Sequence, residues 1–469
     1  MSSRILILGA GPAGMACAYT LAQYRQSCLV IERDHEAGGL CRTLNFHGYL
    51  FDIGGHRFLT KSEEVNRLWH DVMGDDLLRV KRVSRIYYRE RFFHYPLSFF
   101  NTFWNLGLIG SACCVASFLW CKGTQPADDA TYEGWIINRF GRRLYEIFFK
   151  TYTEKVWAVP CHNLSARWAQ QRIRGLSLRV AIRHALLGRN GDAPKTLAEE
   201  FLYPRTGPGE FYRRLTEATT SLGGQFAFGK TVTGIQHNGG KVTVVEVRDG
   251  RGGTIEAVTA DHVFSSLPLP ILVKSLQPRA PEPVLAAANQ LRFRSFIVVN
   301  VILDQAQLFR DQWIYVQSPD VKMGRIQNYK NWSPAMVRDP SKTSLGLEYF
   351  CTEGDKLWRM NDVDLINFAV GELEQLGIVS RRRLIDGFVV RCPNVYPVYS
   401  LEYQRHVTTI RSYLEQFSNL QTVGRGGLFR YDNSDHALLT GLYAARNFLG
   451  KGPYDIWTVN TDGEYLEAS

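Results

Sequence analysis

The first residues of the chain alternate between short apolar runs and a glycine-rich turn. Residues 4–8 read Arg-Ile-Leu-Ile-Leu, which is typical of a parallel strand buried on both faces. The glycine turn at 9–14 leads into an apolar segment through about Tyr24, for which we expect a helix. A second apolar run at 28–31 ends in Glu32. The pattern predicts a strand, a glycine turn, a helix, a strand and an acidic residue, in that order.

The turn has the spacing of a dinucleotide-binding fingerprint, in which each glycine has its own task. Gly9 makes the tight turn, Gly11 lets the backbone approach a pyrophosphate, and Gly14 lets helix and strand pack closely. The helix N-terminus offers free N–H groups and a positive dipole to the phosphates. Glu32 lies eighteen residues beyond Gly14 and is placed to accept hydrogen bonds from the adenosine ribose hydroxyls.

Two further glycine pairs favour FAD over a nicotinamide cofactor. Gly38 and Gly39 follow the acidic residue and let the backbone bend around a longer cofactor. Gly54 and Gly55 would place bare backbone, and then His56, against the isoalloxazine ring. This extension resembles the flavin-containing amine oxidase superfamily, so we expect non-covalently bound FAD. The cofactor residues that we expect are Gly9, Gly11, Pro12, Ala13, Gly14, Glu32, Arg33, Gly39, Leu40, Gly54, Gly55, His56, Val232, Gly424, Arg425 and Asp435.

The rest of the chain predicts an α/β fold with three domains. Helices are expected at 62–73, at 130–152 with another through about 187, near 362–377 and from about 435; strands are expected at 82–95, between 224 and 267, between 292 and 350, at 386–391 and at 420–423. We expect a Rossmann-like FAD-binding domain assembled from 1–80, 200–270 and 415–469. A mainly helical substrate domain would span 81–199, and an antiparallel, sheet-rich substrate domain would span 271–414.

One segment has two interpretations. Residues 104–120 run seventeen residues without a charge, which is marginally short for a membrane span. The segment also contains Gly107 and Gly110, and it lies between stretches that read as globular. A buried or groove-lining helix is the favoured interpretation, and a segment that dips into a membrane, giving peripheral membrane contact, is the alternative.

Composition and charge further limit the number of domains, the partners and the cellular compartment that we expect for this protein. A length of 469 residues calls for two or three domains. The net charge of +10 fits a basic surface or an anionic ligand or surface, but no block of five or six basic residues exists, so we expect no nucleic-acid partner. Nine cysteines without a CxxC pair favour reduced thiols in a cytoplasmic protein, with no metal site. The first strand starts by Ile5, which leaves no room for a signal peptide.

Several motifs resemble the UDP-galactopyranose mutases, closest to the eukaryotic type. The most specific are Gly54-Gly-His56, Tyr95-Pro96, Lys155-Val-Trp157-Ala-Val-Pro160, Arg172, Tyr315, Arg325, Tyr396-Pro397 and the stretch from Arg425 through Tyr431 to His436. The resemblance implies a redox-neutral isomerase that interconverts pyranose and furanose forms of a sugar nucleotide. It also implies that reduced flavin N5 attacks the anomeric carbon and displaces the nucleotide diphosphate. NADPH, NADH or a cellular reductase would be needed only to prime the flavin, and the electron donor stays open.

The resemblance also implies roles for individual residues. Arg172 and Arg325 would clamp the diphosphate, because arginine is always charged and binds phosphate in a bidentate manner. His56 would set the orientation and electronics of the flavin near N5. The hydroxyls of Tyr315, Tyr396 and Tyr431 would bond the diphosphate and sugar. The expected substrate-binding residues are Tyr95, Thr153, Trp157, Trp332 and Asn433.

The sequence departs from the eukaryotic pattern around the nucleotide. Thr153, Leu97 and Ser98 stand where an asparagine, a phenylalanine and a glutamine are expected, and Trp332 replaces a tyrosine. The sugar and the base therefore stay open. The main alternative is an oxidase or dehydrogenase of the amine oxidase superfamily, such as a protoporphyrinogen-oxidase-like or carotenoid-desaturase-like enzyme. A further alternative is a flavin-bearing structural or membrane-associated protein that catalyses no reaction.

Overall fold

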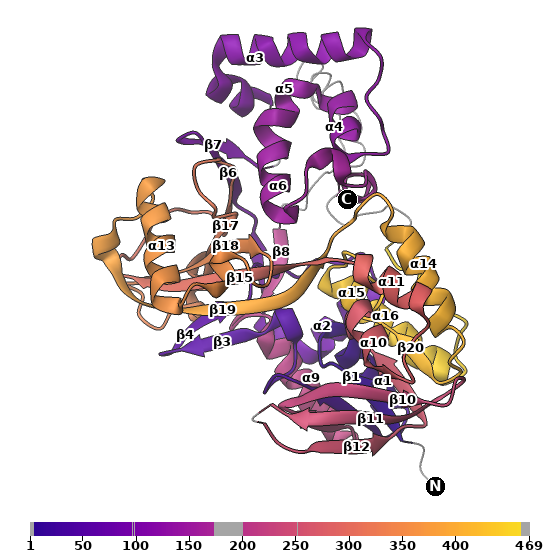
Figure 1. The fold of residues 1–469 in the computed structure, drawn as a ribbon. Coiled ribbons are helices and arrows are strands. Elements are labelled where there is room, and N and C mark those ends of the chain that lie inside the picture. Colours follow the sequence, from indigo (N-terminus) through magenta and orange to yellow (C-terminus); the bar gives the residue numbers. More distant parts are fainter. Residues whose placement is uncertain (1–3, 96, 98, 173–199, 251, 461–469) are drawn as a thin grey trace.

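The computed structural model describes residues 4–95, 97, 99–172, 200–250 and 252–460 (Figure 1). Two sheet-containing regions lie side by side, and a group of helices projects from one end of the molecule (Figure 1). The mixture of a parallel sheet with antiparallel strands and covering helices confirms the predicted α/β class.

The nucleotide-binding region is built on a five-stranded parallel sheet in the order β20-β13-β1-β2-β9. Its strands come from distant parts of the chain: β1 Ile5–Leu8, β2 Cys28–Glu32, β9 Gln225–Phe228, β13 His262–Ser265 and β20 Leu420–Thr422. In β1, Ile5 and Ile7 pack in one hydrophobic core, while Leu6 and Leu8 pack in another on the opposite face. Both faces are buried, as the apolar run predicts.

Different elements cover the two faces of this sheet. One core includes residues of α1 (Pro12–Gln23), α2 (Glu63–Met73), α9 (Gly209–Ser221) and α16 (Ser434–Phe448). The other includes residues of α10 (Leu269–Ser275), α11 (Glu282–Gln290), α14 (Tyr403–Leu414) and a four-stranded sheet. The strands of that sheet, in the order β12-β11-β10-β14, are β10 Lys230–His237, β11 Val242–Asp249, β12 Ile255–Thr259 and β14 Leu276–Gln277.

The second large sheet has seven strands in the order β19-β15-β18-β17-β16-β6-β7. They are β6 Ser84–Tyr88, β7 Arg91–His94, β15 Phe293–Leu303, β16 Trp313–Val316, β17 Arg325–Asn328, β18 Thr343–Cys351 and β19 Leu384–Pro397. Helix α13 (Asp362–Gln375) packs against it through a shared hydrophobic core. The hairpin of β6 and β7 belongs to the stretch expected to be mainly helical, yet it extends the seven-stranded sheet by pairing with β16.

The helical region corrects one expectation. A single helix is predicted over 130–152, but the structure has α4 (Tyr132–Phe140), α5 (Arg142–Tyr145), a π-helical turn and α6 (Thr151–Trp157). The break falls at Gly141, whose φ is +83°. A Cβ there would lie 2.8 Å from the Cα of Phe118, so the neighbouring helix α3 (Phe99–Gly123) approaches too closely for any other residue. The predicted following helix starts as α7 (Arg167–Arg172), and its continuation lies outside the described residues.

The apolar segment at 104–120 also corrects an expectation, because the sequence favours a buried or groove-lining helix there. It forms most of α3, and Trp104 and Trp120 are each 75% exposed. Phe100–Gly123 is long and apolar enough to cross a membrane by length and composition, and only 17% of its apolar window is buried. Burial in the protein therefore does not explain why this segment is apolar.

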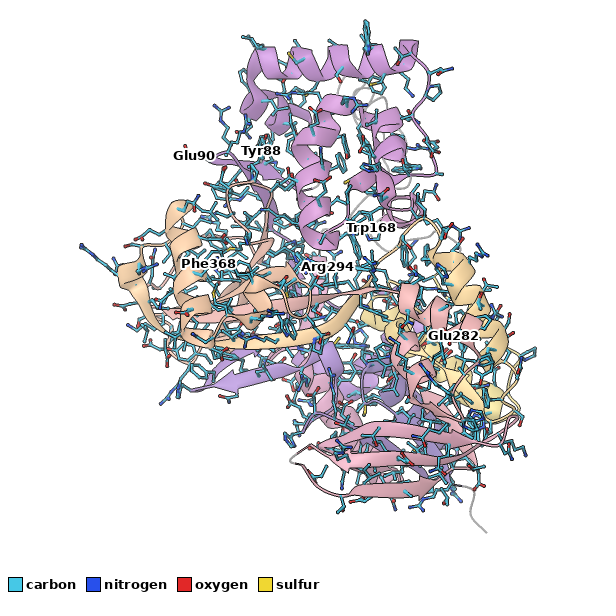
Figure 2. The ribbon with its side chains drawn as sticks, in the orientation of Figure 1. Tyr88, Glu90, Trp168, Glu282, Arg294 and Phe368 are labelled. Carbon is cyan, nitrogen blue, oxygen red and sulfur yellow. The ribbon has the colours of Figure 1, made fainter. Side chains whose placement is uncertain are left out.

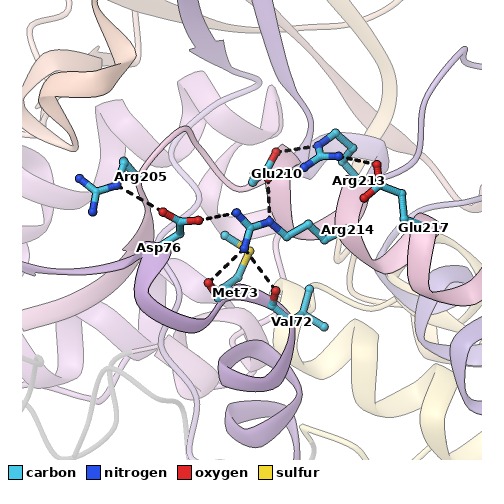
Figure 3. Close-up of polar contacts among 8 residues, drawn as sticks. All are labelled: Val72, Met73, Asp76, Arg205, Glu210, Arg213, Arg214 and Glu217. Atoms are coloured by element: carbon cyan, nitrogen blue, oxygen red, sulfur yellow. Dashed lines mark hydrogen bonds and ion pairs between the residues drawn. The ribbon is translucent and has the colours of Figure 1, made fainter.

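A cluster of charged side chains joins α2 to α9 (Figure 3). Arg214 contacts the carboxylates of Asp76 and Glu210 and donates to the carbonyl of Met73 at 3.1 Å. Arg205 makes a second ion pair with Asp76 at 3.4 Å, and these arginines lower the pKa of that carboxyl. The cluster fixes the end of α2 against α9. The remaining short elements are β3 Thr43–Phe46, β4 Tyr49–Asp52, β5 Leu77–Lys81, β8 Glu200–Pro204, α12 Lys356–Arg359 and α15 Gly424–Gly427.

Candidate active site

The glycine turn between β1 and α1 has the backbone that the fingerprint predicts. Gly9 has a φ of +98°, a conformation that side chains rarely permit. A Cβ on Gly14 would lie 1.9 Å from the carbonyl oxygen of Gly9, so any other residue would force α1 away from β1. At Gly11 no atom of the described residues lies within 4 Å of a Cβ built there. Two glycines are thus needed for the fold, and the third borders open space at the start of α1.

Glu32 is buried at the end of β2 and holds this turn. Its carboxylate accepts hydrogen bonds from the N–H of Ala10 at 2.6 Å and of Asp34 at 2.9 Å. Each carboxylate oxygen has a further lone pair for a ribose hydroxyl. Arg33, the next residue, is exposed. The position of Glu32 beside the turn is therefore compatible with its predicted contact to the ribose.

The second and the C-terminal glycine turns pack on the first. A Cβ on Gly39 would lie 3.2 Å from the Cα of Gly11. Gly424, with a φ of +74°, comes so close to Ala13 that a Cβ there would lie 2.8 Å from that of Ala13. Its N–H donates to the hydroxyl of Thr440 in α16 at 2.9 Å. Three segments that are far apart in sequence therefore meet at the N-terminus of α1.

A cavity lies where these turns face the seven-stranded sheet. One side is formed by the glycine pair after β4 and by the start of α16, and the other by strands of the large sheet. Its lining residues include Leu40, Gly54, Gly55, His56, Arg57, Phe296, Trp313, Tyr315, Arg325, Gln327, Trp332, Tyr396, Arg425, Tyr431, Asn433, Ser434 and Asp435. Arginines, aromatic rings and bare glycine backbone dominate this list, which suits a flat, anionic ligand.

Two glycines let the backbone beside this cavity pack closely against the large sheet. Gly54 has a φ of +84°, and a Cβ on Gly55 would lie 2.8 Å from the side-chain amide of Gln327. His56 follows directly, and its Nδ1 is buried without a hydrogen-bond partner among the described residues. An unpaired buried ring nitrogen points to a ligand that completes the site.

His56 is held in its neutral form. Burial lowers its pKa to about 4, and the positive charge of Arg425 acts in the same direction. A neutral imidazole keeps one nitrogen as an acceptor, so His56 can accept from or donate to a ligand at neutral pH.

The lowered pKa of His56 predicts a loss of stability in acid. Between pH 6.5 and 4 the unfolded chain binds a proton that the folded chain does not bind, so stability is full above pH 6.5 and falls below it. From pH 6.5 to pH 5 the loss is about 2 kcal/mol, at about 1.4 kcal/mol per pH unit. We expect His56→Gln to remove this part of the pH dependence from urea unfolding of the cofactor-free protein. His70→Gln, on the exposed side of α2, should leave it unchanged; equal slopes in His56→Gln and wild type would contradict the assignment.

Arg325 reaches the cavity from the first residue of β17. Its guanidinium forms an ion pair with Glu348 of β18, whose side chain is fully buried, and it donates to the hydroxyl of Tyr396 at 3.2 Å. Gln327 donates to the second oxygen of Glu348 at 2.9 Å. One carboxylate therefore holds two cavity-lining side chains in place. The guanidinium has five N–H donors, so donors remain for an anion.

Two stacked tyrosines form the opposite wall. The rings of Tyr396 and Tyr431 lie 5.5 Å apart at an angle of 14°, and the guanidinium of Arg425 lies over both. Arg425 also donates to the carbonyl of Asp432 at 2.8 Å, which fixes its position. Burial raises the pKa of Tyr396 to about 12, so its hydroxyl stays protonated and can donate. At the start of α16, burial likewise raises the pKa of Asp435.

The motif beginning at Lys155 supports the cavity from behind. The ammonium of Lys155 donates to the carbonyls of Ser318 at 2.6 Å and of Val316 and Met323 at 3.3 Å each. These carbonyls belong to the connection between β16 and β17, which carry Tyr315 and Arg325. Burial lowers the pKa of Lys155 to about 8. The lysine therefore positions a loop and does not itself line the cavity.

The structure brings together most of the predicted substrate residues but not all. Tyr315, Arg325, Trp332, Tyr396, Tyr431 and Asn433 line the cavity, and Tyr95 lies against Tyr315 with 4.8 Å between ring centroids. The indole N–H of Trp332 donates to the carbonyl of Gln312 at 3.0 Å, so it is already used within the fold.

Several of the predicted residues do not appear in the lining of this cavity. Thr153 is buried and donates to the hydroxyl of Tyr132 at 3.0 Å. Trp157 is buried, with its ring steeply inclined to those of Tyr396 and Tyr431, and Val232 packs against the core of the nucleotide-binding region. Arg172 is the last residue of α7, and its side chain lies outside what the structure describes. Its predicted role stays a prediction.

Several residues of the cavity wall and its support were missed, among them the polar residues Arg57, Ser434, Gln327 and Glu348. Arg57 and Ser434 directly follow predicted residues, so their position in the motifs was the available signal. Gln327 and Glu348 lie on the neighbouring strands β17 and β18 and are joined by a side-chain hydrogen bond, although Gln327 pairs with Gly346 in the strand register. Glu348 is the one charged residue in the fully buried strand β18, and such a residue needs a cationic partner.

The family model of the flavin containing amine oxidoreductases matches residues 12–447. The chain therefore belongs to this family, whose cofactor is FAD. Its fold is similar to that of reduced UDP-galactopyranose mutase, with a TM-score of 0.83, 21% identity and coverage of 99% of this chain and 97% of that chain. It is also similar to a protein from Exiguobacterium sp. 255-15 named as a candidate protoporphyrinogen oxidase, with a TM-score of 0.73, 18% identity and coverage of 96% and 100%. A putrescine oxidase follows with a TM-score of 0.62, 14% identity and coverage of 96% and 99%.

Two relatives found by sequence match short segments of the chain. An inactive all-trans-retinol 13,14-reductase of Danio rerio is 40% identical over 50 residues, which are 11% of this chain and 8% of that protein. An uncharacterized protein of Methanothermococcus thermolithotrophicus is 42% identical over 53 residues, or 11% of this chain and 51% of its own. The chain thus matches about half the length, or less, of these relatives.

The described residues fit FAD at both ends of the cofactor. Open space at Gly11 beside the N-terminus of α1 suits a pyrophosphate, and the unpaired Nδ1 of His56 lies in the cavity at the Gly54-Gly55 turn. No histidine or cysteine lies in an evident flavinylation motif. We expect the purified protein to be yellow and acid precipitation to release free FAD into the supernatant. Colour retained in the precipitate would contradict non-covalent attachment.

Proposed function

We propose that this protein is a FAD-dependent mutase that interconverts the pyranose and furanose forms of a nucleotide-linked sugar without net redox change. The observation that carries the proposal is the convergence of Arg325 and Arg425 with the hydroxyls of Tyr315, Tyr396 and Tyr431 on a cavity beside the flavin-binding glycine turns. The full-length similarity in fold to UDP-galactopyranose mutase supports the same activity.

The charge of the cavity suits a diphosphate. Its described lining contains three arginines, Arg57, Arg325 and Arg425, and one acid, Asp435. Glu348 offsets one of these charges from behind the wall. A net positive site with neutral tyrosine donors binds a diphosphate and also stabilises it as a leaving group. Arg172 would complete the clamp.

In this reaction the reduced flavin supplies the nucleophile. The residues of the chain would hold the sugar over the ring, keep the diphosphate within reach for recapture, and exclude water. His56, which is neutral, would accept a hydrogen bond from a ligand in the cavity or donate one to it. NADPH or NADH would serve only to bring the flavin to its reduced state, because the reaction itself consumes no electrons.

We expect the nucleotide pocket to tolerate or prefer a base other than uridine. Thr153, which stands in the place of an asparagine, already donates its hydroxyl to Tyr132 within the fold. Trp332 offers no hydroxyl to the diphosphate in the place of the expected tyrosine. Each polar group of a base that stays unmet lowers discrimination by about 1–3 kcal/mol. The cytoplasm, where sugar nucleotides are made, is the expected location.

Turnover of the reduced protein tests the proposal. The dithionite-reduced enzyme is incubated without oxygen with the galactose and glucose derivatives of UDP, GDP, ADP and dTDP. We expect an isomer of unchanged mass from at least one of them and none with the oxidised enzyme. Arg325→Lys should lower the rate, because lysine cannot bind phosphate as a planar fork, whereas Arg382→Lys on the exposed surface should not.

Oxygen consumption separates this activity from the oxidase alternative. An oxidase would use one oxygen and release one peroxide for each product formed, and it would need no reductant. That result, with no isomer from any sugar nucleotide, would overturn the proposed function.

A further inference from the structure

In the second part of α3 the apolar side chains face outward and the polar ones face the protein, which is the reverse of an ordinary surface helix. Leu108, Ile109, Ala112, Val115, Leu119 and Trp120 share one side of the helix, and we call them the outer face of α3. Their spacing follows the helical repeat, so they form a continuous apolar stripe. Ile109 is 82% exposed and Leu108 is 73% exposed. A stripe of this composition would normally face the protein core.

The polar groups of the same helix point the other way. The hydroxyl of Ser117 accepts from the backbone N–H of Arg143 at 3.1 Å, and that of Ser111 donates to the carbonyl of Phe103 at 3.2 Å. Cys114 and Phe118 are buried between them. The serines thus face the protein while the apolar side chains face outward. Large exposed apolar patches of this kind mark an interaction surface.

The shape of the helix fits docking along a surface better than crossing a membrane. Gly107 interrupts it with a φ of 74° and a ψ of 172°. The segment that follows, 108–120, extends about 20 Å, whereas the apolar core of a bilayer is about 30 Å thick. Its inner side packs so tightly that a Cβ on Gly141 would lie 2.8 Å from the Cα of Phe118. A helix covered by protein along one side cannot be surrounded by lipid, but it can lie in the interface.

The position of α3 in the molecule allows this contact. Figure 1 shows α3 as the outermost element, lying across the end of the helical region and opposite the sheet of β10, β11 and β12. Figure 2 shows side chains on the outer side of α3 that project away from the rest of the protein. A flat surface could therefore meet α3 without touching the nucleotide-binding region.

Charge and aromatic residues identify the surface as lipid. Residues 99–123 contain no carboxylate and one cation, Lys122. Arg91 extends to the carbonyl of Asn105, and the nearby acids Glu133 and Glu146 form ion pairs with Arg142 and Arg143. The whole chain carries a net charge of +10, which attracts an anionic surface. Trp104 and Trp120, both 75% exposed, stand near the two ends of the helix, and tryptophan prefers the headgroup level of a bilayer.

We propose that the outer face of α3 docks the protein in the plane of an anionic membrane surface, with the apolar stripe among the first carbons of the acyl chains. This inference does not depend on the reaction that the enzyme catalyses. Such in-plane helices bind in proportion to the apolar area that they bury, with electrostatic attraction added to it.

Flotation with lipid vesicles tests the proposal. The FAD-loaded protein is mixed with vesicles of phosphatidylcholine and phosphatidylglycerol and centrifuged through a density gradient. We expect the wild type to float with the vesicles and the double variant Ile109→Glu/Leu119→Glu to lose at least about tenfold in partitioning, because both carboxylates would have to enter the apolar layer. Vesicles of phosphatidylcholine alone, or high salt, should weaken binding of the wild type.

A matched control uses exposed apolar residues elsewhere. Val363 and Ile385 are 68% and 51% exposed in another part of the protein, so Val363→Glu/Ile385→Glu adds the same charge away from α3. It should float like the wild type, and both double variants should keep their FAD, which shows that they are folded. Wild-type protein that stays with the soluble fraction would overturn the proposal. So would a wild-type dimer that the α3 variant converts to monomer without any vesicle binding, because the face would then serve a second copy of the chain.

Discussion

Gly14→Ala should prevent stable folding of the nucleotide-binding region and abolish FAD binding. A Cβ at this position would lie 1.9 Å from the carbonyl oxygen of Gly9, which is backbone and cannot rotate away. Helix α1 would have to move off β1, in the centre of the parallel sheet. Overpacking a close contact of this kind costs about 3 kcal/mol or more. The measurement is urea unfolding followed by circular dichroism, together with the ratio of flavin to protein absorbance.

Gly11→Ala provides the matched control for this prediction. Gly11 has a φ of −70° and a ψ of 179°, which alanine adopts without strain, and no atom of the described residues lies near its Cβ. We expect its unfolding to stay within about 0.5 kcal/mol of the wild type. Its FAD content should nevertheless fall at least about tenfold, because the methyl group would occupy the space expected for the pyrophosphate. A Gly11→Ala protein that retains its full flavin would refute the placement of the cofactor.

Gly441 shows why part of this site could not be predicted from sequence. A Cβ on Gly441 would lie 2.0 Å from the carbonyl oxygen of Ala13, so α16 packs on α1 as closely as α1 packs on β1. The fingerprint could be predicted because strand, turn and helix are consecutive, and their spacing fixes the geometry. The contact of Gly441 joins two ends of the chain, and local spacing carries no information about it.

The same distinction explains the errors in the helical region. The apolar periodicity of 130–152 is continuous, and it therefore predicts one helix. The close approach of Phe118 at Gly141 breaks it, and that contact depends on tertiary packing. In α3 the apolar content was visible, but which side faces the protein depends on Ser117 and Phe118 meeting the α4–α5 turn. The sequence thus predicted which segments are helical or apolar better than it predicted which parts of the protein surround them.

The candidate site follows this pattern too. Arg325 could be recognised from its motif, and it lines the cavity. Its partner Glu348 lies on the neighbouring strand β18, directly opposite Arg325 in the strand register. Strand order brings the two residues together, and strand order is a property of the whole fold. The pairing changes what a substitution at Arg325 can be expected to do.

Arg325→Ala should destabilise the protein by about 3–5 kcal/mol, apart from any effect on ligand binding. The reason is that Glu348, which is fully buried, would lose its ionic partner, and an unpaired charge in the interior is costly. Urea unfolding of the FAD-free protein measures this directly. Arg411→Ala breaks an exposed ion pair with Glu415, next to the end of α14, and should cost less than about 1 kcal/mol.

The double variant Arg325→Met/Glu348→Gln separates the loss of the pair from the loss of the partner. Removing both charges leaves no unpaired ion, and the amide introduced in place of Glu348 can still bond Gln327, so most of the stability should return. The coupling between the two positions, measured as a double-mutant cycle, should exceed about 2 kcal/mol. A double variant as unstable as Arg325→Ala would show that the guanidinium stabilises the wall by packing against Phe350 and Tyr396 instead of by neutralising Glu348. Affinity for a nucleotide diphosphate should then be compared between Arg325→Lys and the wild type, because the lysine keeps Glu348 paired while removing the planar fork that grips phosphate.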